Sequence, residues 1–131
     1  MILLTKEQII AKCKEADINF LRLQFTDILG VVKNVSIPIS QMECALNNET
    51  MFDGSSIEGF ARVEESDMIL KPDLDTFAIF PWRPQEKAVA RIICDIFTPE
   101  NKPFEGDPRY VLKKVIAEAA QCGSRMRILF I

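Results

Sequence analysis

Residues 88–97 alternate between two kinds of side chain, and this pattern constrains the fold more than any other in the chain. Five apolar residues occupy every second position: Ala88, Ala90, Ile92, Cys94 and Ile96. Arg91 and Asp95 stand between them. Because successive side chains of a strand point to opposite faces, the pattern predicts a β-strand with one buried face. Such a face must be covered by another layer, so we expect a sheet with helices packed on it.

The first part of the chain predicts a helix followed by a hairpin. Thr5 and Gln8 form a capping-box pattern, and apolar residues at helical spacing follow it over residues 6–16. Alternating apolar residues then predict two strands within residues 18–37. A turn at Gly30, which can adopt a positive φ, connects these strands.

The middle of the chain predicts a short helix, a loop and two short strands. Ser40 and Glu43 repeat the capping-box pattern before a helix that ends at residues 47–48. Residues 50–66 show neither the helical nor the strand period, which predicts an extended functional loop. Two further strands are predicted, an edge strand over residues 67–72 and an apolar strand over residues 77–82.

A turn-rich junction at residues 98–103 marks the best domain boundary. Beyond it, Asp107 and Pro108 fit the N-cap and first position of a helix, and Gly123 fits its C-terminal cap. The apolar face of this helix consists of Val111, Leu112, Val115, Ile116, Ala119 and Cys122. The element order predicts an α+β domain with a small mixed sheet over residues 1–105, and residues 106–131 begin a second unit.

Composition excludes several classes of function. The chain has no histidine, so it cannot form a Ser-His-Asp or Cys-His system or an imidazole zinc site. Its four cysteines form no C-x-x-C pair, which favours buried apolar thiols in a reducing, cytoplasmic location. The net charge of −3 argues against sequence-independent nucleic-acid binding. No apolar stretch approaches the length of a membrane span, and no secretory signal is recognised.

Polar side chains concentrate in residues 51–68. Asp53 offers a carboxylate, and Ser55 and Ser56 supply hydroxyl groups beside it, a combination that suits a small cation. The alternative is a turn whose side chains bond their own backbone, and the pattern alone favours this alternative. Arg62 can grip a carboxylate or phosphate, or it can form a surface ion pair with neighbouring acidic residues.

Four segments together resemble the N-terminal part of bacterial glutamine synthetases. They are residues 52–60 (FDGSSIEGF), 65–68 (ESDM), 71–73 (KPD) and 104–109 (FEGDPR). The step at residues 60–62 (FAR) is similar to the form found in Gram-positive bacteria. The resemblance covers about residues 1–122 in register. Residues 124–131 depart from the family pattern, so we expect a truncated chain that ends after the first helix of the catalytic domain.

The resemblance implies a β-grasp, ubiquitin-like domain of an enzyme that ligates ammonia to glutamate with ATP and Mg²⁺ or Mn²⁺. In this family the active site lies between subunits of a ring, and the N-terminal loop comes from the neighbouring subunit. By resemblance, Asp53 binds ammonium and assists its deprotonation in trans, with Ser56 close by. Arg62 corresponds to an arginine involved in feedback inhibition by glutamine, and Phe60 lies near the nucleotide.

The chain alone is expected to bind no cofactor or metal and to be inactive, because the family's ATP, metal and glutamate sites lie in the catalytic domain. Expected partners are glutamine synthetase subunits, either identical or full-length, and nitrogen-responsive transcription regulators; neither membranes nor nucleic acids are expected. Two alternatives stay open. The chain can be a stand-alone β-grasp interaction or regulatory module, or a non-functional fragment that merely folds.

Overall fold

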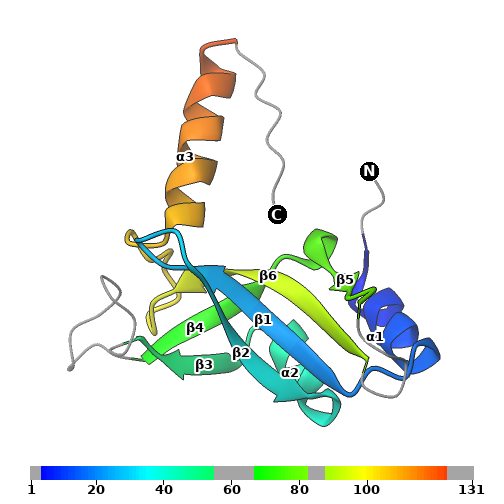
Figure 1. Cartoon of the computed structure of the whole chain (residues 1–131). Helices are drawn as coiled ribbons and strands as arrows, with labels where there is room; N and C mark the ends of the chain where they lie inside the picture. The colour runs from blue at the N-terminus through cyan, green and yellow to red at the C-terminus, as the bar shows by residue number, and fades with distance from the viewer. Residues whose placement is uncertain (1–3, 55–66, 83–87, 124–131) are drawn as a thin grey trace.

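The computed structural model describes residues 4–54, 67–82 and 88–123 (Figure 1). The strands are β1 (Phe20–Thr26), β2 (Val32–Pro38), β3 (Thr50–Asp53), β4 (Asp67–Pro72), β5 (Ala78–Ile79) and β6 (Val89–Phe97). The helices are α1 (Lys6–Glu15), α2 (Met42–Leu46) and α3 (Pro108–Gln121), with 3-10 turns at η1 (Ile39–Gln41) and η4 (Leu74–Thr76). The strands form one mixed sheet in the order β2-β1-β6-β4-β3, and β5 pairs with β6. The predicted α+β class is confirmed.

The predicted helix and hairpin at the start of the chain are confirmed. Thr5 Oγ1 accepts a hydrogen bond from Gln8 N at 3.2 Å, and Gln8 Oε1 accepts one from Thr5 N at 2.9 Å. These bonds form the capping box of α1. At the hairpin turn, the buried Asp27 carboxylate accepts hydrogen bonds from Leu29 N and Val31 N, both at 2.9 Å. Gly30 has a φ of +82°, the left-handed conformation that favours glycine.

Strand β6 lies at the centre of the sheet and carries the predicted alternation. It runs parallel to β1 and antiparallel to β4 and β5. All five residues of the predicted face are buried. The opposite face is less polar than predicted, because Val89 and Ile93 are also buried. The segment after β4 bonds to both residues: Ile93 N donates to Thr76 Oγ1 at 2.8 Å, and Phe80 N donates to the Val89 carbonyl at 3.0 Å.

Three strand predictions need correction. The predicted loop over residues 50–66 begins with strand β3, which pairs with β4. Because β3 covers that side, β4 is an interior strand and not the predicted edge strand. Pro72 is tolerated because it is the last residue of β4. The predicted strand over residues 77–82 is reduced to the two residues of β5, since Pro81 and Trp82 form a turn.

The predicted Ser40–Glu43 capping box is also wrong. After Pro38 the chain forms the 3-10 turn η1, and α2 begins at Met42. The N-cap of α2 is therefore Gln41, which makes no side-chain capping bond. The predicted end at residues 47–48 is confirmed, and Asn48 has a φ of +63°.

The core lies between one face of the sheet and helices α1 and α2. Its most buried side chains include Ile9, Cys13, Leu21, Leu23, Leu46, Met68, Leu70, Ile92 and Ile96. Helix α3 extends away from this core (Figure 1). Its predicted caps are confirmed, because Asp107 accepts a hydrogen bond from Arg109 N and Gly123 has a φ of +79°. In the described residues there is no helix with both the length and the apolar character needed to cross a lipid bilayer.

Candidate functional site

Asp53 lies at the end of β3, where the predicted site loop begins. The side chains of β3 alternate, so that Phe52 is partly buried and Asp53 is exposed. The Phe52 ring packs against Phe25 of β1, with ring centroids 4.8 Å apart. This contact anchors β3 on the core and fixes the face from which Asp53 projects.

A second carboxylate lies directly across the strand pair from Asp53. In the register of β3 and β4, Asp53 is opposite Asp67, and both residues are exposed. Side chains at directly opposed positions are about 4.5–5.5 Å apart at Cβ, and like charges there destabilise the pair. A cation beside the two carboxylates would relieve this repulsion. The adjoining ends of β3 and β4 therefore carry two acidic side chains.

The other predicted site residues lie outside the described part of the chain. These residues are Ser55, Ser56, Phe60 and Arg62. Their roles remain predictions, and of the predicted set the structure places only Asp53.

The donor groups in the described residues do not fit a resident divalent metal. No three His, Cys, Asp or Glu side chains come together there in a group that could hold an ion. The two buried thiols are poor ligands at neutral pH, because burial raises the pKa of Cys13 to about 11 and raises the pKa of Cys94 further. No reaction step is therefore assigned to a metal held by this part of the chain.

A polar cluster that the sequence reasoning missed connects α3 to the sheet. We define this clamp as Asp73, Asp95, Arg109 and Lys113. Arg109 donates to Asp73 Oδ2 at 2.6 Å and to Asp95 Oδ1 at 2.9 Å. Lys113 donates to Asp95 Oδ2 at 2.6 Å. Hydrogen bonding and charge attraction from the two carboxylates raise the pKa of the Arg109 guanidinium, although its burial acts in the opposite direction.

The buried carboxylate of Asp107 also connects α3 to the sheet. It is 0% exposed, and its Oδ2 accepts a hydrogen bond from Ile96 N at 3.0 Å while Oδ1 accepts one from Arg109 N at 3.1 Å. Burial raises the pKa of the Asp107 carboxyl, and the two backbone hydrogen bonds oppose this shift. The only sequence signal for this arrangement was the N-cap pattern at Asp107 and Pro108, which indicates the capping bond but not the bond to β6.

The mixed sheet with helices on one face is the architecture of a β-grasp domain. The sequence profile described as "Glutamine synthetase, beta-Grasp domain" matches residues 17–99. This chain belongs to that glutamine synthetase family. The predicted β-grasp fold is thereby confirmed.

Bacterial glutamine synthetases match over most of this chain. The glutamine synthetase of Clostridium saccharobutylicum is 60% identical over 124 residues, which cover 95% of this chain and 28% of that protein. That of Staphylococcus aureus strain Mu50 is 58% identical over 119 residues, which cover 91% of this chain and 27% of that protein. The chain thus spans just over a quarter of the length of these relatives.

Solved structures show the same fold. A structure described as "GmaS/ADP complex-Conformation 1" has a TM-score of 0.78 and 28% identity, over 87% of this chain and 26% of that chain. A Plasmodium falciparum glutamine synthetase has a TM-score of 0.79 over 94% of this chain and 24% of that chain. At 22% identity, the second likeness supports the fold alone.

Proposed function

We propose that this chain supplies the ammonium side of a glutamine synthetase active site that lies between two subunits. The observation that carries the proposal is the position of Asp53. It is an exposed carboxylate at the end of a strand anchored on the core, and it is directly opposite Asp67. A pocket completed by another polypeptide needs such an outward-facing group.

In the proposed mechanism, Asp53 holds ammonium through charge-assisted hydrogen bonds and accepts a proton as ammonia forms. Ser56 adds a hydroxyl group that can donate or accept a hydrogen bond beside it. Phe60 would lie near the nucleotide, and Arg62 would take part in feedback inhibition by glutamine. The reaction joins ammonia to glutamate with ATP.

We assign residues 1–105 to the β-grasp domain and residues 106–131 to the beginning of the catalytic domain. The ATP, the Mg²⁺ or Mn²⁺ and the glutamate would be held by the part of the relatives that this chain does not span. The chain would therefore make no glutamine by itself and would act in the cytoplasm together with other glutamine synthetase subunits. Its exposed Cys44 and Cys122 fit such a reducing compartment.

The test is a chimera that joins residues 1–122 of this chain to the remainder of the Clostridium saccharobutylicum glutamine synthetase. The chimera should make glutamine from glutamate, ammonia and ATP. Asp53→Asn should lower kcat/KM for ammonium by about 10²-fold, the usual scale for losing a positioned proton acceptor. Asp75→Asn is the matched control, because Asp75 is also exposed but lies in η4.

Two results would contradict the proposal. One is a folded chimera in which Asp53→Asn leaves ammonium kinetics unchanged. The other is an equal loss of activity in the Asp75→Asn control, since that would indicate a general effect of removing surface charge.

A stand-alone interaction module is a second candidate function, and exposed apolar residues favour it. Ile28, Leu29, Val31 and Val32 are all exposed around the β1–β2 turn. Four apolar side chains in five consecutive positions are typical of an interaction surface. Co-purification distinguishes the two candidate functions. The active-site role requires that glutamine synthetase subunits co-purify with this chain, whereas the interaction module requires only that a transcription regulator does.

A further inference from the structure

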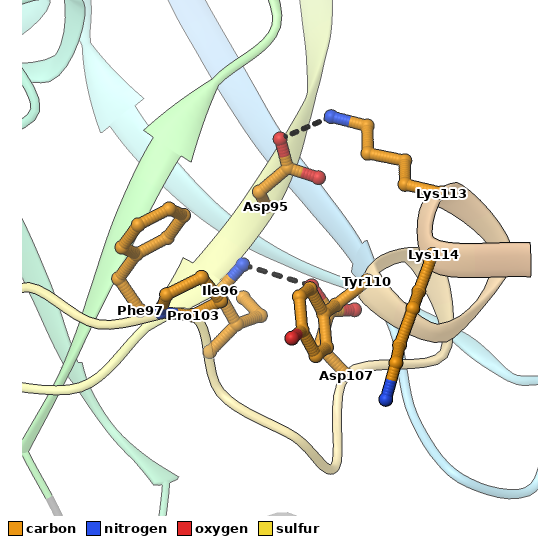
Figure 2. Close-up of a pocket in the computed structure, with 8 residues that line it drawn as sticks. All are labelled: Asp95, Ile96, Phe97, Pro103, Asp107, Tyr110, Lys113 and Lys114. Carbon is orange, nitrogen blue, oxygen red and sulfur yellow. Dashed lines mark hydrogen bonds and ion pairs between the residues drawn. The ribbon is translucent and has the colours of Figure 1, made fainter. Parts of the chain in front are cut away.

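We infer that a pocket between β6 and α3 binds a small carboxylate with an aromatic body. The inference is independent of the proposed function, because it concerns a different part of the domain from Asp53. The pocket has a volume of about 350 Å³ and is lined by Asp95, Ile96, Phe97, Pro103, Asp107, Tyr110, Lys113 and Lys114 (Figure 2). This volume lies at the lower end of the range for small-molecule sites in proteins.

The apolar part of the pocket has two walls. Phe97 and Pro103 form one wall. The chain turns back after β6, so that Pro103 forms an isolated β-bridge with Phe97, the last residue of β6. Tyr110 lies on the other wall and Lys114 follows one helical turn later on α3, so the two side chains are neighbours (Figure 2). A flat aromatic body can pack against the Pro103 and Tyr110 side chains that line the pocket.

Hydrogen bonds hold the walls in place. Ile96 donates its N–H to Asp107, and its carbonyl accepts from Phe104 N at 3.0 Å. In the connecting turn, Thr98 N donates to the Lys102 carbonyl at 2.8 Å. The cavity is therefore formed before any ligand arrives, which lowers the entropic cost of binding.

Of the charged residues that line the pocket, Asp95, Asp107 and Lys113 already have hydrogen-bond partners within the described residues. Both oxygens of Asp95 accept hydrogen bonds from the clamp, one from Arg109 and the other from Lys113. Both oxygens of Asp107 accept hydrogen bonds from backbone N–H groups. Lys114, in contrast, makes no ion pair with any described residue.

A further cation lies beside the Phe97 wall. Lys71 Nζ is 3.9 Å from the centroid of the Phe97 ring. The Asp95 and Asp107 carboxylates already accept hydrogen bonds from other groups of this chain. A ligand carboxylate would therefore meet the Lys114 ammonium group at the edge of the pocket. The apolar walls and this ammonium group together define the ligand class.

The test is a titration of the ¹⁵N-labelled full chain with naphthalene-2-carboxylate and with its neutral analogue naphthalene-2-carboxamide, each followed by NMR chemical shifts. We expect both compounds to shift the amide signals of Phe97, Tyr110 and Lys114. The carboxylate should bind about fivefold more tightly, the ratio that an exposed ion pair supplies. Lys114→Gln should abolish this preference, whereas Lys14→Gln, at an exposed position on α1, should leave it unchanged.

Several results would overturn the inference. Equal affinity for the two compounds, or a preference that persists in Lys114→Gln, would exclude recognition of the carboxylate by Lys114. Shifts confined to other regions would place binding elsewhere. An absence of shifts at about 5 mM ligand would mean that the pocket takes no such compound. Because the readout is binding and not glutamine synthesis, none of these results bears on the role of Asp53.

Discussion

At the scale of single residues, Asp107 joins two elements through one carboxylate. It caps α3 through Arg109 N and satisfies the backbone N–H of Ile96 in β6, and Ile96 is itself fully buried. An N-cap contributes about 1 kcal/mol, and a buried N–H left without a partner costs about 1–3 kcal/mol. Loss of this carboxylate should therefore lower the free energy of unfolding.

We expect Asp107→Ala to lower the free energy of unfolding by about 2–4 kcal/mol, the sum of these two effects. Thr5→Ala is the matched control, because Thr5 caps α1 at an exposed position and bonds no second element. Its cost should be about 1 kcal/mol. Urea unfolding monitored by circular dichroism measures both, and equal losses would contradict the double role of Asp107.

Because the pKa of Asp107 is raised in the folded chain, its contribution to the free energy of unfolding depends on pH. Because burial favours the protonated form, the folded chain binds this proton more tightly than the unfolded chain, whose carboxyl has a pKa near 3.8. The associated stability is fully present below about pH 4 and is lost as the pH rises through the folded-state pKa. The stability of the natural chain relative to Asp107→Asn should therefore fall from acidic to neutral pH in urea unfolding. A relative stability that rises over this range would contradict the assigned shift.

At the scale of elements, the sequence predicted those whose pattern is strong and local. The alternation in β1 and β6 and the capping box of α1 are set by neighbouring residues, and the structure confirms them. Strand β3 was missed because its four residues are too few to establish a period, and pairing with β4 stabilises it. The predicted cap of α2 failed because a 3-10 turn occupies its position.

The candidate site was predictable only in part. The family motif identified Asp53, and the structure adds its exposure and its position opposite Asp67. The clamp brings together residues that are up to 36 positions apart, as in the bond from Arg109 to Asp73. No local period or spacing encodes such a contact, because it depends on how α3 packs against the sheet.

The clamp is the main polar connection between α3 and the sheet within the described residues. Arg109 is 9% exposed and is the only buried residue of the helix. Its two partners come from β6 and from the turn after β4, so the guanidinium fixes the direction of α3 relative to both. Under the domain assignment proposed above, the direction of this helix determines where the catalytic domain begins.

We expect Arg109→Met to lower the free energy of unfolding by about 2–4 kcal/mol, because it leaves two partly buried carboxylates facing an apolar side chain. Amide hydrogen exchange in α3 should accelerate more than exchange in β6. Lys113→Met is the control: Lys113 is more exposed, and its loss should cost at most about 1 kcal/mol. Equal effects of the two substitutions would contradict the central place of Arg109 in the clamp.

At the scale of the whole molecule, the described surface leaves apolar side chains uncovered on α3. Val111 is 48% exposed and Val115 is 46% exposed, and they lie one helical turn apart. Of the apolar face predicted from the sequence, Val111 and Val115 are exposed, whereas Leu112, Ile116 and Ala119 are partly buried. Single exposed apolar side chains are ordinary, whereas a continuous stripe is typical of a surface that packs against another element.

We therefore expect this chain to self-associate in solution. In sedimentation velocity under reducing conditions, the weight-average mass should rise with protein concentration. The double substitution Val111→Lys with Val115→Lys should shift the chain to monomer, because four-carbon side chains ending in charges cannot be buried against a second apolar stripe. The matched control is Ala120→Lys with Gln121→Lys, which adds the same charge at two exposed positions of α3. Since the control changes charge without removing a large apolar side chain, it should still associate. If both double variants became monomeric, general charge repulsion would explain the result, and the α3 stripe would not be the contact surface.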